Sequence, residues 1–122
     1  MGKIISTFNG DVQIHELNET QELQDSKELL GKCGNGFKAS EAYSNSNGSS
    51  ATPTITIKER TIWVYHGRQG GGSITGTILR GTGGEYGFSK DGKYDVEPGT
   101  YTHYINGYIY NDGWIASGIC YK

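Results

Sequence analysis

Long apolar runs, basic clusters and cysteines are all scarce in this chain of 122 residues. No apolar run approaches the roughly 18 residues that would span a bilayer. The first residues, MGKIISTFNGDVQ, lack the apolar stretch of a secretory signal. We therefore expect no transmembrane segment, and either a cytoplasmic location or release by a non-classical route.

Positive charge is also scarce. The formal net charge is −2 at pH 7, and the acidic residues outnumber the basic ones in residues 1–52. Proteins that bind nucleic acid strongly carry a basic excess, which neutralises phosphates and releases counterions. We do not expect nucleic acid to be a main partner.

Cys33 and Cys120 are the only two cysteines. They fit a disulfide in an oxidising compartment and two buried thiols in a reducing one equally well. Both alternatives stay open at the level of sequence.

The size of the chain predicts a single domain, covering residues 1–122. Apolar residues make up only 34%, but the sequence contains 20 glycines and nine tyrosines. Aromatic and β-branched residues favour strands and are depleted in disordered segments. This composition indicates a turn-rich β protein.

Alternating apolar and polar residues dominate from Pro53 onward, beginning with PTITIKE. Turn residues recur between the short runs, at KDGK, Pro98-Gly99 and Asn111-Asp112-Gly113. Short strands with frequent turns predict an all-β fold, an antiparallel sandwich or jelly roll or a small closed barrel.

The first part of the chain has weaker patterns. Asn9-Gly10 lies between two alternating runs and predicts a β-hairpin. Good helix formers near residues 19–30 allow at most one short helix. The Ser/Asn/Gly-rich segment at about residues 44–52 predicts a mobile loop inside the single domain.

A run of three glycines occurs in YHGRQGGGS, residues 65–73. A phosphate-binding P-loop would end in Lys-Ser/Thr and lead into a helix, whereas this run lacks that ending and precedes the strand-like SITGTIL. The run therefore predicts a hairpin connection between two strands, since glycine tolerates positive φ angles.

Four side chains could support acid-base chemistry, namely His66, Arg68, Glu85 and His103. Small ribonucleases combine such groups on one face of a sheet, so a ribonuclease-like toxin is one alternative function. No spacing motif connects the four residues, and we favour a protein that is not an enzyme. DGKYDVE lacks the order of a calcium loop, so no metal or cofactor is predicted.

Aromatic residues beside Asn and Asp are the most informative feature of the second half. Sugar recognition needs an aromatic face for the apolar side of a pyranose and planar polar groups for its hydroxyls. Tyr, Trp and Asn also predominate in binding loops. The predicted ligand contacts are Tyr108, Tyr110, Asn111, Asp112 and Trp114, with Tyr65, His66 and Arg68 as a second cluster.

The segment from Tyr94 to Tyr121, with His103, the turn at residues 111–113 and the ending Gly118-Ile119-Cys120-Tyr121, resembles the small all-β subunit of binary insecticidal toxins. That resemblance implies a lectin-like fold and binding of a glycan or membrane receptor. The leading hypothesis is a binding domain for a glycan or other surface ligand. A third alternative is a protein-binding toxin subunit or an inhibitor of a partner protein.

Overall fold

The computed structural model describes residues 3–6, 33, 36–45 and 50–122 of the chain. The regular elements in these ranges are all strands, which confirms the predicted all-β class. The strands are β1 (Lys3–Ser6), β2 (Lys38–Asn45), β3 (Ser50–Ala51), β4 (Thr54–Ile57), β5 (Thr61–Gly81), β6 (Gly84–Phe88), β7 (Gly92–Asp95) and β8 (Gly99–Tyr121). In these ranges the chain has no helix with the length and apolar character needed to cross a membrane.

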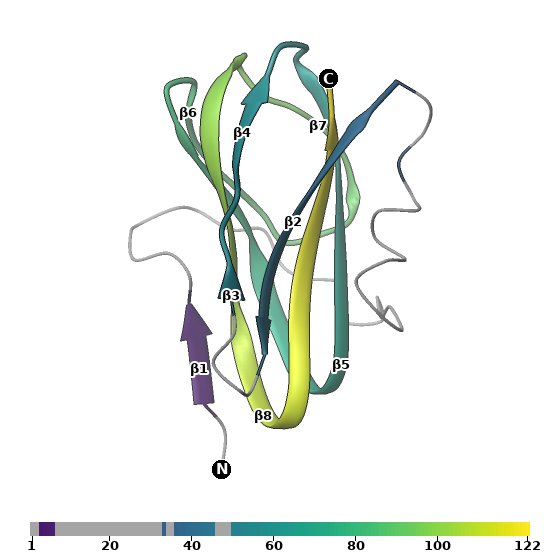
Figure 1. The fold of residues 1–122 in the computed structure, drawn as a ribbon, viewed down its shortest axis with the longest axis vertical. Helices are drawn as coiled ribbons and strands as arrows, with labels where there is room; N and C mark the ends of the chain where they lie inside the picture. The colour runs from purple at the N-terminus through teal and green to yellow at the C-terminus, as the bar shows by residue number, and fades with distance from the viewer. Residues whose placement is uncertain (1–2, 7–32, 34–35, 46–49) are drawn as a thin grey trace.

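Two long strands, β5 and β8, form the centre of the fold. They pair antiparallel from Trp63 opposite Cys120 to Gly81 opposite Tyr101. Both strands bend together at the lower end of Figure 1, so the ribbon that they form is folded back on itself. The sheet of eight antiparallel strands therefore curls into a half-barrel, and its two halves face each other as in a sandwich.

The shorter strands widen the two halves of this ribbon. β2 pairs with the C-terminal part of β8 and β7 with the N-terminal part of β5, which together make the first half. β1 and β4 pair with the N-terminal part of β8, and β6 pairs with the C-terminal part of β5, which together make the second half. β3 is a two-residue strand on the outer edge of β2.

Alternate residues of each half point into the interior, as β4 illustrates with Ile55 and Ile57 buried and Thr54 and Thr56 exposed. Burying one Ile or Leu side chain contributes about 1.5–3 kcal/mol. The first apolar cluster draws on both halves and contains Ile55, Ile57, Ile62, Val64, Leu79, Phe88, Val96, Tyr101, Ile119 and Tyr121. The second apolar cluster contains Ala42, Ile74, Ile105, Ile109 and Ile115.

The glycine run at residues 70–72 lies inside β5, so the predicted hairpin connection there is wrong. Gly70 has a φ of 67°, and the register of β5 against β8 shifts between Gln69 and Gly71. Glycine adopts this conformation without strain from a Cβ atom. The strand can therefore change register and continue along β8, where a hairpin would have reversed it.

The predicted turn Asn111-Asp112-Gly113 is also wrong, because these residues lie inside β8. Gln69 pairs with Trp114 and Gly71 with Tyr110, so residues 111–113 face Gly70 alone. Extra residues on one strand form a β-bulge, which increases the local bend and twist. Residues 111–113 therefore lie where the ribbon of β5 and β8 folds back on itself.

Part of the Ser/Asn/Gly-rich segment predicted as a mobile loop at about residues 44–52 forms strands, and residues 46–49 lie outside the described residues. Ser44 and Asn45 end β2, and Ser50–Ala51 form β3, because pairing with neighbouring strands overrides a weak local preference. The predicted helix near residues 19–30 and the predicted turn at Asn9-Gly10 lie outside the described residues.

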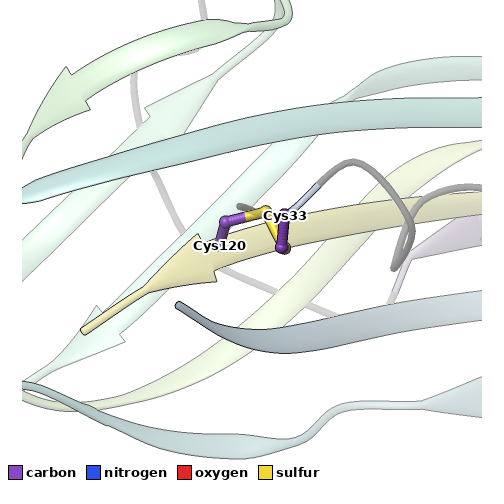
Figure 2. Close-up of a disulfide and its surroundings, with 2 residues drawn as sticks. All are labelled: Cys33 and Cys120. Atoms are coloured by element: carbon purple, nitrogen blue, oxygen red, sulfur yellow. A yellow bond between two sulfur atoms is a disulfide. The ribbon is translucent and has the colours of Figure 1, made fainter. Parts of the chain in front are cut away.

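A disulfide joins Cys33 to Cys120, near the end of β8 (Figure 2). Cys120 pairs with Ala39 on β2 and Trp63 on β5. Since its neighbours Ile119 and Tyr121 belong to the first apolar cluster, Cys120 faces outward. The bridge therefore lies on the outer side of the first half.

Candidate functional site

The outer side of the first half carries a row of small residues. Ala116 on β8 pairs with Tyr43 on β2 and with Gly67 on β5. Gly118, two residues further along β8, points to the same side and pairs with Tyr65. Ala116, Gly67 and Gly118 are buried, which means that larger neighbours cover them.

Aromatic side chains provide that cover. Tyr43, Tyr65 and Trp114 pack on Ala116 and are each only half-buried. The rings of Tyr43 and Trp114 have centroids 6.0 Å apart and planes tilted by 33°. Trp63 lies two residues before Tyr65, on the same side of β5, and is 37% exposed. We call these four residues the aromatic face.

Amide side chains border the aromatic face at one end. Asn45 and Gln69 both pair with Trp114 in register, one on each neighbouring strand. Trp114 Nε1 donates a hydrogen bond of 2.8 Å to Gln69 Oε1, and Asn45 Nδ2 donates one of 3.3 Å to the Tyr43 hydroxyl. These contacts hold the two rings in place and leave polar groups beside them.

The structure brings only part of the predicted ligand set together. Trp114 and Tyr65 belong to the aromatic face, although they come from different predicted clusters. Tyr108 is 37% exposed but lies on the second half, opposite Ser73, and Asp112 is exposed in the β8 bulge. The side chains of Tyr110 and Asn111 lie outside the described part of the chain.

The other two predicted contacts, His66 and Arg68, point to the inside of the half-barrel. Arg68 pairs with the buried Ile115, and its Nη1 donates a hydrogen bond of 2.7 Å to the Gly72 carbonyl. His66 is only 1% exposed. Neither residue belongs to the aromatic face.

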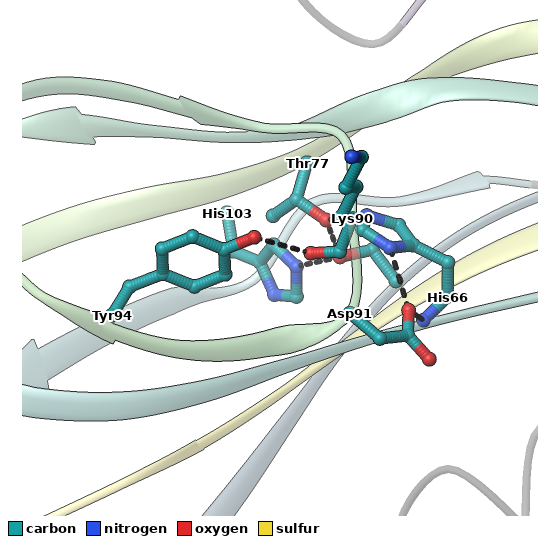
Figure 3. A network of polar contacts seen from close by, with 7 residues as sticks. His66, Thr77, Lys90, Asp91, Tyr94 and His103 are labelled. Carbon is teal, nitrogen blue, oxygen red and sulfur yellow. Dashed lines mark hydrogen bonds and ion pairs between the residues drawn. The ribbon is translucent and has the colours of Figure 1, made fainter. Parts of the chain in front are cut away.

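His66 belongs to a chain of polar contacts in the core (Figure 3). Asp91 Oδ1 accepts a hydrogen bond of 2.8 Å from the His66 backbone N–H, and the same oxygen lies 2.9 Å from His66 Nδ1. On the other side of the ring, His66 Nε2 lies 2.6 Å from Thr77 Oγ1.

The chain continues across both halves. The Thr77 hydroxyl contacts that of Ser117, and Ser117 Oγ lies 2.8 Å from His103 Nε2. His103 Nδ1 in turn lies 2.9 Å from Ser40 Oγ on β2. We call the six residues of this chain the polar layer: Ser40, His66, Thr77, Asp91, His103 and Ser117.

The structure does not bring the four residues of the ribonuclease hypothesis together, and Arg68 bonds the Gly72 carbonyl away from the other three. His66 and His103 share the polar layer, but they are 1% and 0% exposed. Glu85 lies at the surface, where its Oε1 is 2.9 Å from Arg80 Nε. A substrate could contact neither imidazole unless the two halves separated.

Sequence reasoning missed Tyr43, Trp63, Asn45 and Gln69 as site residues. Alternation does put Trp63, Tyr65 and Gln69 on one side of β5, so that part of the face could have been found. Tyr43 and Asn45 lie in a segment whose Ser, Asn and Gly content masks its strand character.

Within the described residues, no three His, Cys, Asp or Glu side chains are close enough to hold a metal ion. Searches against protein-family models, curated proteins and solved structures found no match for this chain.

Proposed function

We propose that this chain is a non-enzymatic binding domain that recognises a glycan or a similar surface ligand through the aromatic face. The observation that carries the proposal is the grouping of Tyr43, Trp63, Tyr65 and Trp114, from three strands, on one side of the sheet. Each of these side chains remains partly exposed.

The chemistry of the face suits a sugar ring. The C–H groups of a pyranose pack against an aromatic ring, and its hydroxyls bond to planar amide or carboxylate groups. The rings of Tyr43 and Trp114 could supply the stacking surface, and the amides of Asn45 and Gln69 lie beside them.

The proposed site differs from the one expected from sequence because it is built on strands. Side chains on paired strands are held by backbone hydrogen bonds and by packing on Ala116. A rigid site loses less conformational entropy when a ligand binds. We therefore expect binding without rearrangement of the face.

Trp114→Ala is expected to weaken binding of the glycan ligand about tenfold to a hundredfold, or about 1.4–2.7 kcal/mol. The substitution removes the ring that packs against Tyr43 and is hydrogen-bonded to Gln69. A glycan array would identify the ligand, and titration calorimetry would measure its affinity. Trp114→Phe, which keeps an aromatic ring, should retain most of the affinity.

Tyr108→Ala is the matched control, because Tyr108 is as exposed as Trp63 but lies on the other half of the fold. The Tyr108→Ala variant should bind the glycan ligand with the same affinity as the unmodified protein. If Tyr108→Ala abolishes binding while Trp114→Ala does not, the ligand binds around Tyr108 on the second half and the aromatic face is not the site. Absence of any ligand on the array and in tryptophan quenching would refute the proposal.

A further inference from the structure

The polar layer divides the core into two parts. Along β8, Tyr101 of the first apolar cluster precedes His103, and Ile105 of the second cluster follows it. Further along the same strand, Ser117 lies between Ile115 of the second cluster and Ile119 of the first. Polar side chains from β2, β5 and β8 thus form a continuous layer between two apolar regions.

The position of each proton in the polar layer follows from its end at Asp91. An ionised carboxylate can only accept hydrogen bonds, so His66 Nδ1 must carry a proton and donate it. When Nε2 carries no hydrogen, it accepts a hydrogen bond from the Thr77 hydroxyl. The Thr77 oxygen consequently accepts from Ser117.

The proton positions at the other end of the layer follow from the Ser117 hydroxyl. Because the Ser117 hydrogen points to Thr77, the Ser117 oxygen accepts a hydrogen bond from His103 Nε2–H. His103 Nδ1 then carries no hydrogen and accepts a hydrogen bond from the Ser40 hydroxyl. The two rings have opposite tautomers in this arrangement.

One more proton breaks this arrangement. If His103 gained a proton, its Nδ1 would become a donor and the Ser40 hydroxyl would have to turn its hydrogen away. The positive charge would then lie on a side chain that is 0% exposed and that contacts the hydroxyls of Ser40 and Ser117. A buried polar group without a partner is costly, and a buried charge is more so.

The groups in contact with the two rings are Ser40 from β2, Thr77 from β5, Ser117 from β8 and Asp91 before β7; of these, only Asp91 is charged. Its carboxylate contacts His66, not His103.

We propose that the polar layer is an acid-sensitive latch that holds the two halves of the folded ribbon together at neutral pH and releases them when His103 is protonated. The latch joins the halves directly, since Ser40, His66 and Ser117 belong to the first half and Thr77 and His103 to the second. This inference is independent of the proposed glycan site, which lies on the outer side of the sheet.

The sign of the pH effect follows from His103. Burial first, and then the nearby His66, lower the pKa of His103 from 6.5 to about 3. The unfolded chain therefore binds a proton between these pH values and the folded chain does not. Stability is complete above pH 6.5 and falls as the pH decreases toward 3.

The test compares unfolding by urea at several pH values for the unmodified chain and for His103→Gln. The contribution of His103 should raise the unfolding constant of the unmodified chain about tenfold per pH unit below 6.5. The His103→Gln variant should lack that contribution, so its unfolding constant should depend less on pH. The carboxylates and the other histidines are present in both proteins. The difference in pH dependence between the two proteins therefore measures the contribution of His103.

A second measurement needs no variant. Nitrogen NMR shifts at pH 7.5 or above report which ring nitrogen of each histidine carries the proton, and we expect Nδ1–H for His66 and Nε2–H for His103. Equal tautomers in the two rings would overturn the proposed arrangement. An identical pH dependence of stability in the unmodified chain and a folded His103→Gln variant would overturn the latch.

Discussion

Replacing Cys33 and Cys120 together by serine is expected to lower the free energy of unfolding by about 4 kcal/mol. The disulfide joins residues 87 positions apart, so it closes a very long loop. A cross-link of this kind restricts the unfolded chain, and the model estimate of its effect increases with loop length. Urea unfolding of the oxidised protein and of the double variant would measure the difference.

The reduced form of the unmodified protein is the matched control, because it has the same sequence as the oxidised form. Its stability should agree with that of the double-serine variant. Two titratable thiols in the native, air-purified protein would contradict the bridge. Equal stability of the oxidised and reduced forms would show that the bridge forms without stabilising the fold.

Gly81→Ala is expected to destabilise the fold by about 3 kcal/mol, at the upper end of the usual effect of overpacking. A Cβ atom on Gly81 would overlap the Thr100 carbonyl oxygen and would lie 2.7 Å from Tyr101 Cα, both of which are backbone atoms of the adjacent strand. The Thr100 oxygen also accepts the Thr82 N–H at 3.0 Å. The strands would have to separate, with loss of that hydrogen bond.

Gly92→Ala provides the comparison for this prediction. Gly92 also lies in a paired strand, but its added Cβ would meet only the Tyr94 ring, at 3.6 Å, which is an ordinary contact. Its effect should be within about 0.5 kcal/mol. Denaturant midpoints with unchanged m-values would measure both variants, and similar effects of the two substitutions would be inconsistent with the proposed overlap.

Local patterns in the sequence were sufficient to predict the fold class. The alternation of Thr54, Ile55, Thr56 and Ile57 appears in the structure as exposed and buried faces of β4. The same patterns misjudged where strands end, because Gly, Asn and Asp residues are common to turns and to bulges. Only the pairing of Gly70 with the bulge of β8 distinguishes the two cases, and that pairing is a long-range property.

The candidate site was predictable to a similar degree. Trp114 and Tyr65 could be singled out as aromatic residues beside polar ones, but their proximity depends on the register in which β8 pairs with β5. The sequence suggested His66 and His103 only as alternative catalytic groups. Their burial follows from strand parity, since both point to the inside of the folded ribbon, and parity was unknown until the register was known.

The folded ribbon of β5 and β8 also sets the order in which the chain can assemble. Gly81 and Tyr101 are close in sequence, whereas Trp63 and Cys120, at the other end of the same ribbon, are far apart. Closing a short loop costs less entropy than closing a long one, and folds dominated by distant contacts form slowly. We expect pairing to begin beside Gly81 and to extend toward Cys120, so that the contact with Cys33 is made late and the oxidation of the cysteines reports the completion of folding.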